Sequence, residues 1–170
     1  MENATKALMI AAGVLVGMLI ISLGLYLYFS LSDYVSETQE EIKLNEITSF
    51  NTQFLNYNNV ELSNNGIEMP ETKFKVTIQD VITVANIAYE NNQKYNLSVE
   101  NANENTLYVT VNAILYREDG TTSRVTHLEK DVKEKASDWL SYDKGYQYRC
   151  SASNIKISQV TGRVYEINFK

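Results

Sequence analysis

One uncharged run constrains this chain more than any other feature of its sequence. Between Lys6 and Asp33 there are 26 residues without a charged side chain, and the strongly apolar part, residues 7–29, contains 23 of them. Folded as a helix at about 1.5 Å per residue, this part spans roughly 35 Å, which is enough to cross a hydrocarbon core of about 30 Å. The run therefore predicts a transmembrane helix that is kept in the mature protein.

The alternative is a secretory signal that is cleaved. Such signals have a shorter apolar region, of about 7–15 residues, followed by a cleavage site of small residues. The one candidate site is Ser30-Leu31-Ser32, and the apolar run before it is longer than a signal needs. Tyr26 and Tyr28 lie at the end of the run, where aromatic residues gather at membrane interfaces. Both observations favour a retained anchor.

The charges on either side of the run indicate its orientation. Lys6 precedes it, whereas residues 33–46 contain five acidic residues and one basic residue, Lys43. Because positively charged flanks tend to stay in the cytoplasm, we expect a cytoplasmic N-terminus and an extracytoplasmic C-terminal domain. This predicts a single-pass protein of the cell membrane, in contact with membrane lipid.

Three glycines share nearly one face of the predicted membrane helix. Gly13 and Gly17 form a GxxxG spacing, and Gly24 follows Gly17 by seven residues. Small residues at such spacings let a second helix approach closely, which drives association in lipid. We therefore predict self-association, or a membrane-protein partner, through this face. The alternative is an incidental pattern, because glycine is common in membrane helices.

Helix signals continue beyond the membrane segment. Residues 25–65 contain neither glycine nor proline, the two residues least compatible with a helix interior. One helix is therefore expected over about residues 4–57, with a break near residues 30–33 or 46–52 as the alternative.

An apolar stripe lies in the second half of this helix. Leu44, Ile47, Phe50, Phe54 and Tyr57 recur at steps of three and four, the pattern of an amphipathic helix. Phe50, Phe54 and Tyr57 are expected to pack on the soluble domain, with contact to a second protomer as the alternative.

The sequence after this helix first predicts a loop and a second helix. Residues 60–75 carry an Asn-Asn-Gly turn and the one proline, so they are expected to form a loop with a short hairpin. A capping-box pattern from Thr77 to Asp80 then begins an amphipathic helix. This helix is expected to end at Asn91-Asn92.

Strands follow. Residues 107–117 alternate between two faces, and Asp119-Gly120 is expected to form a hairpin turn to a returning strand. A helix over residues 129–140 is expected to turn Val132, Ala136 and Leu140 inward. Further strands are expected at residues 146–150, 155–160 and 163–169.

This order of elements predicts an α+β fold: a long N-terminal transmembrane helix continuing outside, then a helix and an antiparallel β-meander domain. Residues 1–32 would form the tail and membrane helix. Residues 33–58 would form a juxtamembrane helix, and residues 59–170 the extracytoplasmic α+β domain.

Charge and motifs argue against several classes of function. The net charge of −6 and the lack of a Lys/Arg cluster argue against a nucleic-acid partner. No Cys/His metal spacing and no Gly-rich phosphate loop occurs in the sequence, so neither a metal nor a cofactor is predicted. His127 is expected on a strand without a catalytic acid or nucleophile nearby, and Cys150 is expected to be a small buried residue. We therefore predict a protein that is not an enzyme.

Three tyrosines near the C-terminus allow two interpretations. Tyr142, Tyr146 and Tyr148 lie in and before an expected strand. Alternate tyrosines on a strand commonly pack partway into a core, and the alternative is an exposed aromatic patch for recognition.

The N-terminal third resembles a known family. The chain begins with a short N-terminus that contains an acid, Glu2, followed by a long apolar helix that continues outside and then by a sheet. This plan is similar to that of type IV pilins, including Tad-type pilins and pseudopilins. The resemblance covers about residues 1–60, and Lys6 departs from it because the helix is already apolar there in that family. The stretch MENATKALMIAAGVL also resembles small, uncharacterised single-span proteins of low-GC Gram-positive bacteria.

The resemblance implies a helix that serves as membrane anchor and then as the core of an assembly. The predicted function is therefore a non-enzymatic membrane protein that assembles as a pilin-like component or as part of a secretion or pilus apparatus. The alternative is a membrane-anchored extracellular binding or sensory module.

Overall fold

The computed structural model describes residues 2–141 and 145–170. The chain divides into two compact units, one ending at Glu46 and one spanning Ile47–Lys170. The second unit begins inside the segment 33–58 that the sequence suggested as a separate juxtamembrane helix.

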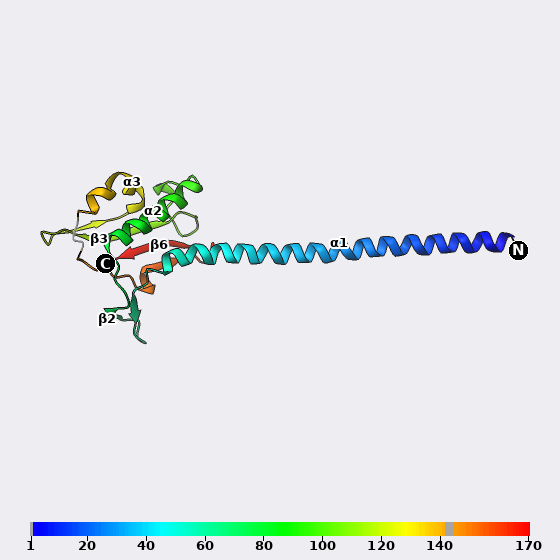
Figure 1. Ribbon diagram of the computed structural model, residues 1–170, viewed down its shortest axis with the longest axis horizontal. Coiled ribbons are helices and arrows are strands. Elements are labelled where there is room, and N and C mark those ends of the chain that lie inside the picture. The colour runs from blue at the N-terminus through cyan, green and yellow to red at the C-terminus, as the bar shows by residue number, and fades with distance from the viewer. Residues whose placement is uncertain (1, 142–144) are drawn as a thin grey trace. The chain divides into compact units, whose positions relative to one another are not determined.

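The first helix, α1 (Glu2–Leu55), is continuous (Figure 1). Neither of the breaks considered from the sequence, near residues 30–33 or 46–52, is present. The reason is local: with no glycine or proline in this part of the chain, nothing interrupts the backbone hydrogen bonds of the helix.

The first unit exposes its apolar side chains. No residue between 2 and 46 is buried, and the large apolar side chains from Leu8 to Phe29 are 53–74% exposed. Such a continuous apolar surface is unfavourable in water. By length and composition this helix is a candidate membrane span, although a signal sequence near the N-terminus would share these properties.

The second unit is built on a four-stranded sheet. Its strand order is β4 (Thr122–Val125), β3 (Thr110–Tyr116), β6 (Val164–Phe169) and β5 (Ile155–Ile157). The pairs β3–β4 and β5–β6 are antiparallel, whereas β3 and β6 run parallel. The predicted α+β fold is confirmed, with a sheet that is mixed because of this central parallel pair.

Two helices cover one face of the sheet (Figure 1), α2 (Ile78–Lys94) and α3 (Leu128–Trp139). A separate hairpin is formed by β1 (Val60–Leu62) and β2 (Glu68–Thr72). Two single turns of 3-10 helix, η1 (Val99–Asn101) and η2 (Ala152–Asn154), complete the unit.

The core lies between the helices and the sheet. From β3 it takes Val111, Ala113 and Leu115, the alternating face that the sequence predicted. Ile167 and Phe169 of β6 are also buried. The helices contribute their own buried stripes, which include Ile78, Val81, Ala85 and Ala88 from α2, and Leu128, Val132 and Trp139 from α3.

Local signals account for the starts of several elements. The capping box at the start of α2 is confirmed, because the backbone N–H of Thr77 donates to Asp80 Oδ2 at 2.7 Å. The turn between β3 and β4 contains Gly120 at φ +79°, a left-handed conformation that glycine adopts without strain.

Two sequence predictions about strands and helices are wrong. Residues 146–150 form no strand, because their backbone groups bind separate segments: Tyr148 N–H donates to the carbonyl of Val76, and Cys150 N–H to the side chain of Asn59. Leu140 is exposed and Trp139 is buried in its place. Counted from Leu128, Trp139 lies about 20° and Leu140 about 120° around the helix, so Trp139 falls on the inward face and Leu140 does not.

Candidate functional site

A cavity of about 350 Å³ is the strongest candidate site in the described part of the second unit. It lies where the end of α2, η1, the segment before β3 and the start of α3 meet. Its lining includes Tyr89, Leu97, Val99, Tyr108, Glu129 and Lys130. Cavities of this size and mixed lining suit a small organic molecule.

The carboxyl group of Glu129 is the buried charge at this cavity. The residue is 1% exposed and lies in the first turn of α3. Its Oε1 accepts a hydrogen bond from the Tyr108 hydroxyl at 2.8 Å, and its Oε2 accepts one from the Val111 N–H at 2.8 Å. Nδ1 of His127 lies 3.0 Å from Oε1. The hydrogen bonds from Tyr108 and Val111 suit a carboxylate, which only accepts, and Nδ1 of His127 adds a third when it carries the proton.

His127 is held in an unusual backbone conformation. It precedes α3 with φ 57° and ψ 49°, and its N–H donates to Asn112 Oδ1 at 3.1 Å. The sequence prediction placed it on a strand without an acid nearby, and both parts are wrong. β4 ends at Val125, and the left-handed turn at His127 brings its ring to Glu129.

Two asparagines of α2 hold the segment before β3. Asn92 Nδ2 donates to the carbonyl of Val109 at 2.9 Å, and Asn92 Oδ1 accepts from the Val109 N–H at 2.8 Å. Asn91 Nδ2 donates to the carbonyl of Leu107 at 2.7 Å. The expected end of α2 at Asn91-Asn92 is therefore wrong. The side-chain amides of both residues form hydrogen bonds with the backbone of the segment before β3, as a neighbouring strand would, and the helix continues to Lys94.

These contacts fix Tyr108 between the two asparagines and Glu129. Burial, and then the negative charge of Glu129, raise the pKa of the Tyr108 hydroxyl far above its ordinary range. The hydroxyl therefore stays protonated and donates to the carboxylate over the whole physiological pH range.

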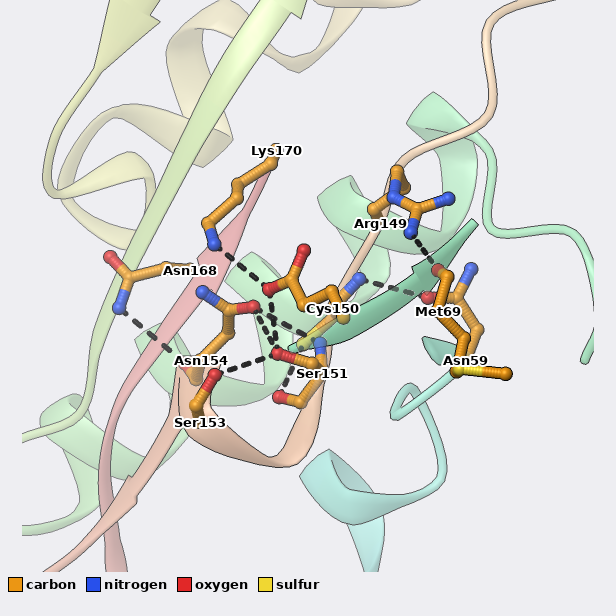
Figure 2. Close-up of polar contacts among 10 residues, drawn as sticks. Asn59, Met69, Arg149, Cys150, Ser151, Ser153, Asn154, Asn168 and Lys170 are labelled. Carbon is orange, nitrogen blue, oxygen red and sulfur yellow. Dashed lines mark hydrogen bonds and ion pairs between the residues drawn. The ribbon is translucent and has the colours of Figure 1, made fainter. Parts of the chain in front are cut away.

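A second polar cluster surrounds Ser151, which is fully buried. Its hydroxyl lies 2.9 Å from Glu68 Oε1 and 2.6 Å from Asn154 Oδ1, and 2.8 Å from the hydroxyl of Ser153. Figure 2 shows Ser153 and Asn154 beside Ser151. Glu68 Oε1 also accepts from Lys170 Nζ at 2.9 Å. The cluster thus ties the β1–β2 hairpin to the C-terminal strand.

The same segment holds the hairpin through two further contacts. The Arg149 guanidinium points at the backbone of Met69 (Figure 2) and donates to the carbonyls of Met69 and Pro70. Asn59 Oδ1 accepts from the Cys150 N–H at 2.8 Å. This arrangement is a structural clamp, because its polar groups are engaged with one another.

Two groups in the clamp have shifted pKa values. Hydrogen bonds from Lys170 and Ser151 lower the pKa of Glu68 below its ordinary value. Burial raises the pKa of the Cys150 thiol to about 12. Cys150 is therefore a protonated, buried residue at neutral pH.

The glycines of the predicted helix-packing face are open in the single chain. A Cβ atom placed on Gly13, Gly17 or Gly24 would meet nothing within 4 Å. This face is therefore free of contacts with the chain's own side chains, and nothing in the single chain tests its predicted partner.

The aromatic residues predicted to pack on the domain lie at its core. Phe54 is fully buried, and Phe50 and Tyr57 pack against the core beside it. The rings of Phe50 and Phe54 lie 5.1 Å apart, and those of Tyr57 and Phe169 lie 6.4 Å apart.

The C-terminal tyrosines do not form a free aromatic patch in the part of the chain that is described. Tyr148 is fully buried, and Tyr146 is half-buried and stacks on Tyr116 at 3.5 Å between ring centroids. Tyr142 lies outside the described residues.

Comparison with protein-family models, with curated proteins and with solved structures finds no match. The contacts within the chain itself therefore carry the functional argument. Across residues 2–141 and 145–170, no group of three or more His, Cys, Asp or Glu side chains is arranged to hold a metal ion.

Sequence reasoning missed Glu129 as a site residue. It stood at the start of an expected helix, where acids are common because they favour the helix N-terminus. The partners of Glu129, Tyr108 and Val111, are 21 and 18 residues away in the sequence. The one local signal was His127 two residues before it.

Proposed function

We propose that the chain is a non-enzymatic single-pass membrane protein that assembles as a pilin-like or secretion-apparatus component. The carrying observation is the continuity of α1: one helix has an exposed apolar N-terminal part and, in its last turn, places Phe54 in the core of the second unit. A helix of this kind would serve as the membrane anchor at one end and as part of a folded unit at the other. The N-terminus would be cytoplasmic and the second unit extracytoplasmic.

Association within the membrane supplies the physical basis of assembly. Lipid tails are as apolar as leucine, so burial of apolar side chains gives little drive for two helices to pair. Close backbone approach over Gly13 and Gly17 does give such a drive, and this face of α1 is open. The proposal is thus a homotypic contact, or a contact with another membrane helix, at this face.

Crosslinking in membranes tests the assembly. Gly17→Ile keeps the segment apolar and places a branched side chain where a partner backbone would lie. Wild-type protein is expected to crosslink as oligomers, and Gly17→Ile as monomer, with the same amount inserted. Ala12→Ile is the matched control, because it adds the same side chain about 140° away from Gly17 around the helix. Equal oligomers from wild type and Gly17→Ile would refute the proposed contact.

Protease accessibility tests the location. A protease added to intact protoplasts is expected to digest the chain after Ser32, because the second unit would face outward. Protection in intact protoplasts, with digestion only after lysis, would refute this orientation. An N-terminus that is cut away during export, seen by mass spectrometry of the membrane fraction, would identify a signal sequence in place of an anchor.

A second function, a membrane-anchored binding or sensory module, is favoured by the cavity beside Glu129. A module of this kind needs the anchor only as a tether. It would therefore tolerate Gly17→Ile and lose its function when the cavity is filled.

A further inference from the structure

We propose that the cavity beside Glu129 binds a small organic ammonium ion with an apolar body. This inference rests on the second function above, the binding module, and it names the chemical class of the ligand. It is carried by three observations on the lining of the cavity: a buried carboxylate with unused capacity, an excess of acidic over basic groups, and apolar and aromatic walls.

A carboxylate offers about four acceptor positions, and the groups around Glu129 take three of them. Two of these contacts are to Oε1 and one, from the Val111 N–H, is to Oε2. Oε2 therefore keeps one acceptor position, and Glu129 is part of the lining of the cavity. An ammonium N–H is the group that uses such a position best, because both partners are charged.

The charge of Glu129 is also poorly compensated. The Tyr108 hydroxyl and the Val111 N–H are neutral donors, and His127 adds positive charge only when its ring is protonated. Among the described residues, no lysine or arginine forms an ion pair with Glu129. A buried carboxylate that lacks a cation is unfavourable, so a bound cation would stabilise the second unit.

The remaining lining agrees with a cation in size and charge. Glu100 adds a second carboxylate at the exposed edge, so the lining contains two carboxylates, Glu100 and Glu129, and one ammonium group, that of Lys130. The walls are formed by Tyr89, Leu97 and Val99. Lys133 Nζ already lies 5.1 Å from the centroid of the Tyr89 ring, so these three side chains serve to bury the apolar part of a ligand.

Calorimetric titration of the full chain in lipid nanodiscs tests the proposal, with empty nanodiscs as the blank. The probes are 2-phenylethylammonium, phenylacetate and phenylalanine, which share a ring and differ in charge. The ammonium probe is expected to bind most tightly, and phenylacetate not at all. Glu129→Gln should weaken ammonium binding about ten- to hundredfold, because a hydrogen bond between charged groups is lost.

A second variant, which fills the cavity, tests the proposed site even if Glu129→Gln does not fold. Val99→Trp adds a large side chain at the half-buried wall and is expected to abolish binding of the ammonium probe. Val160→Trp is the matched control at a position that is 73% exposed and outside the lining. Ammonium binding that survives Val99→Trp would overturn the proposed site.

The three probes separate failure of the ligand class from failure of the binding function. Tighter binding of phenylacetate or phenylalanine, lost in Val99→Trp, would overturn the ammonium class and leave the binding module standing, with Lys130 holding a carboxylate. Absence of binding by all three probes would overturn both.

Discussion

The guanidinium carbon of Arg163 lies 3.7 Å from the ring centroid of Phe50. Arg163 stands in the turn between β5 and β6, and Phe50 lies in the last turns of α1. The same guanidinium donates to Asn91 Oδ1 on α2 at 2.8 Å. Beside it, Asn51 Nδ2 donates to the carbonyl of Gly162, and Asn51 Oδ1 accepts from the Val164 N–H, each at 2.8 Å. One turn thus joins the end of α1 to the sheet and to α2.

Arg163→Ala should weaken the packing of this turn against α1 and α2. It removes the contacts of the cation with the rings of Phe50 and Tyr95 and its hydrogen bonds to Asn91 and Tyr95, a loss of about 2 kcal/mol in the free energy of unfolding. The measurement is urea unfolding in detergent micelles, followed by the fluorescence of Trp139, the one tryptophan of the chain, which is 3% exposed. Arg163→Lys, which keeps the charge without the planar guanidinium, should recover only part of the loss. An unfolding midpoint of Arg163→Ala equal to that of the wild type would show that these contacts do not stabilise the second unit.

Phe54→Ala should destabilise the second unit by about 3–5 kcal/mol, because it leaves a cavity in the core. Leu55→Ala is the matched control at the next residue, where the side chain is 40% exposed, and it should change the midpoint little. The same fluorescence assay serves for both variants. Similar midpoints for the two variants would mean that the core does not depend on the Phe54 ring.

Glu68→Gln should lower stability at neutral pH and have no effect in acid. The pKa of Glu68 is lowered from its ordinary value of 4.5 by Lys170 and Ser151, so the folded state favours the charged form. The stabilisation is fully present above about pH 4.5, and it is lost as the pH falls through the lower pKa of the folded state. Unfolding midpoints of wild type and variant, measured from pH 7 downward, should therefore converge.

Glu71→Gln on the same strand is the control for Glu68→Gln. Glu71 is exposed, and removing its charge should leave a pH profile like that of the wild type. A gap between wild type and Glu68→Gln that stays constant down to pH 2 would show that the charge of Glu68 does not stabilise the fold.

Cys150 should react with thiol reagents only after unfolding. Its thiol is fully buried and its pKa is raised to about 12, and the thiolate is the reactive form. Iodoacetamide at pH 8 should leave the folded protein unmodified by mass spectrometry and label it quickly in denaturant. Equal labelling rates in the two conditions would contradict the burial of Cys150.

The elements that the sequence predicted well are those with local signals. The uninterrupted helix, the capping box at Thr77 and the alternation from Val109 to Leu115 each depend on residues close together in the chain. The burial of Phe54 follows from the same kind of periodic pattern.

The parts that were missed depend on long-range pairing. Asn91 and Asn92 predicted a helix end, because asparagine is common there. Their amides instead form hydrogen bonds with the backbone of the segment before β3. The cavity escaped prediction for a similar reason: Glu129 becomes a site residue only when Tyr108 and Val111 reach it. No local pattern in the sequence indicates these long-range contacts.

The parallel pairing of β3 with β6 also has a consequence for biogenesis. β6, the last strand in the sequence, occupies an inner position of the sheet, with β3 on one side and β5 on the other. A nascent chain that stops short of Val164 leaves the inner edges of both neighbours unpaired. The sheet of the second unit therefore cannot close until residue 169 has emerged from the ribosome, so β3, β4 and β5 must wait for β6 although they are synthesised earlier.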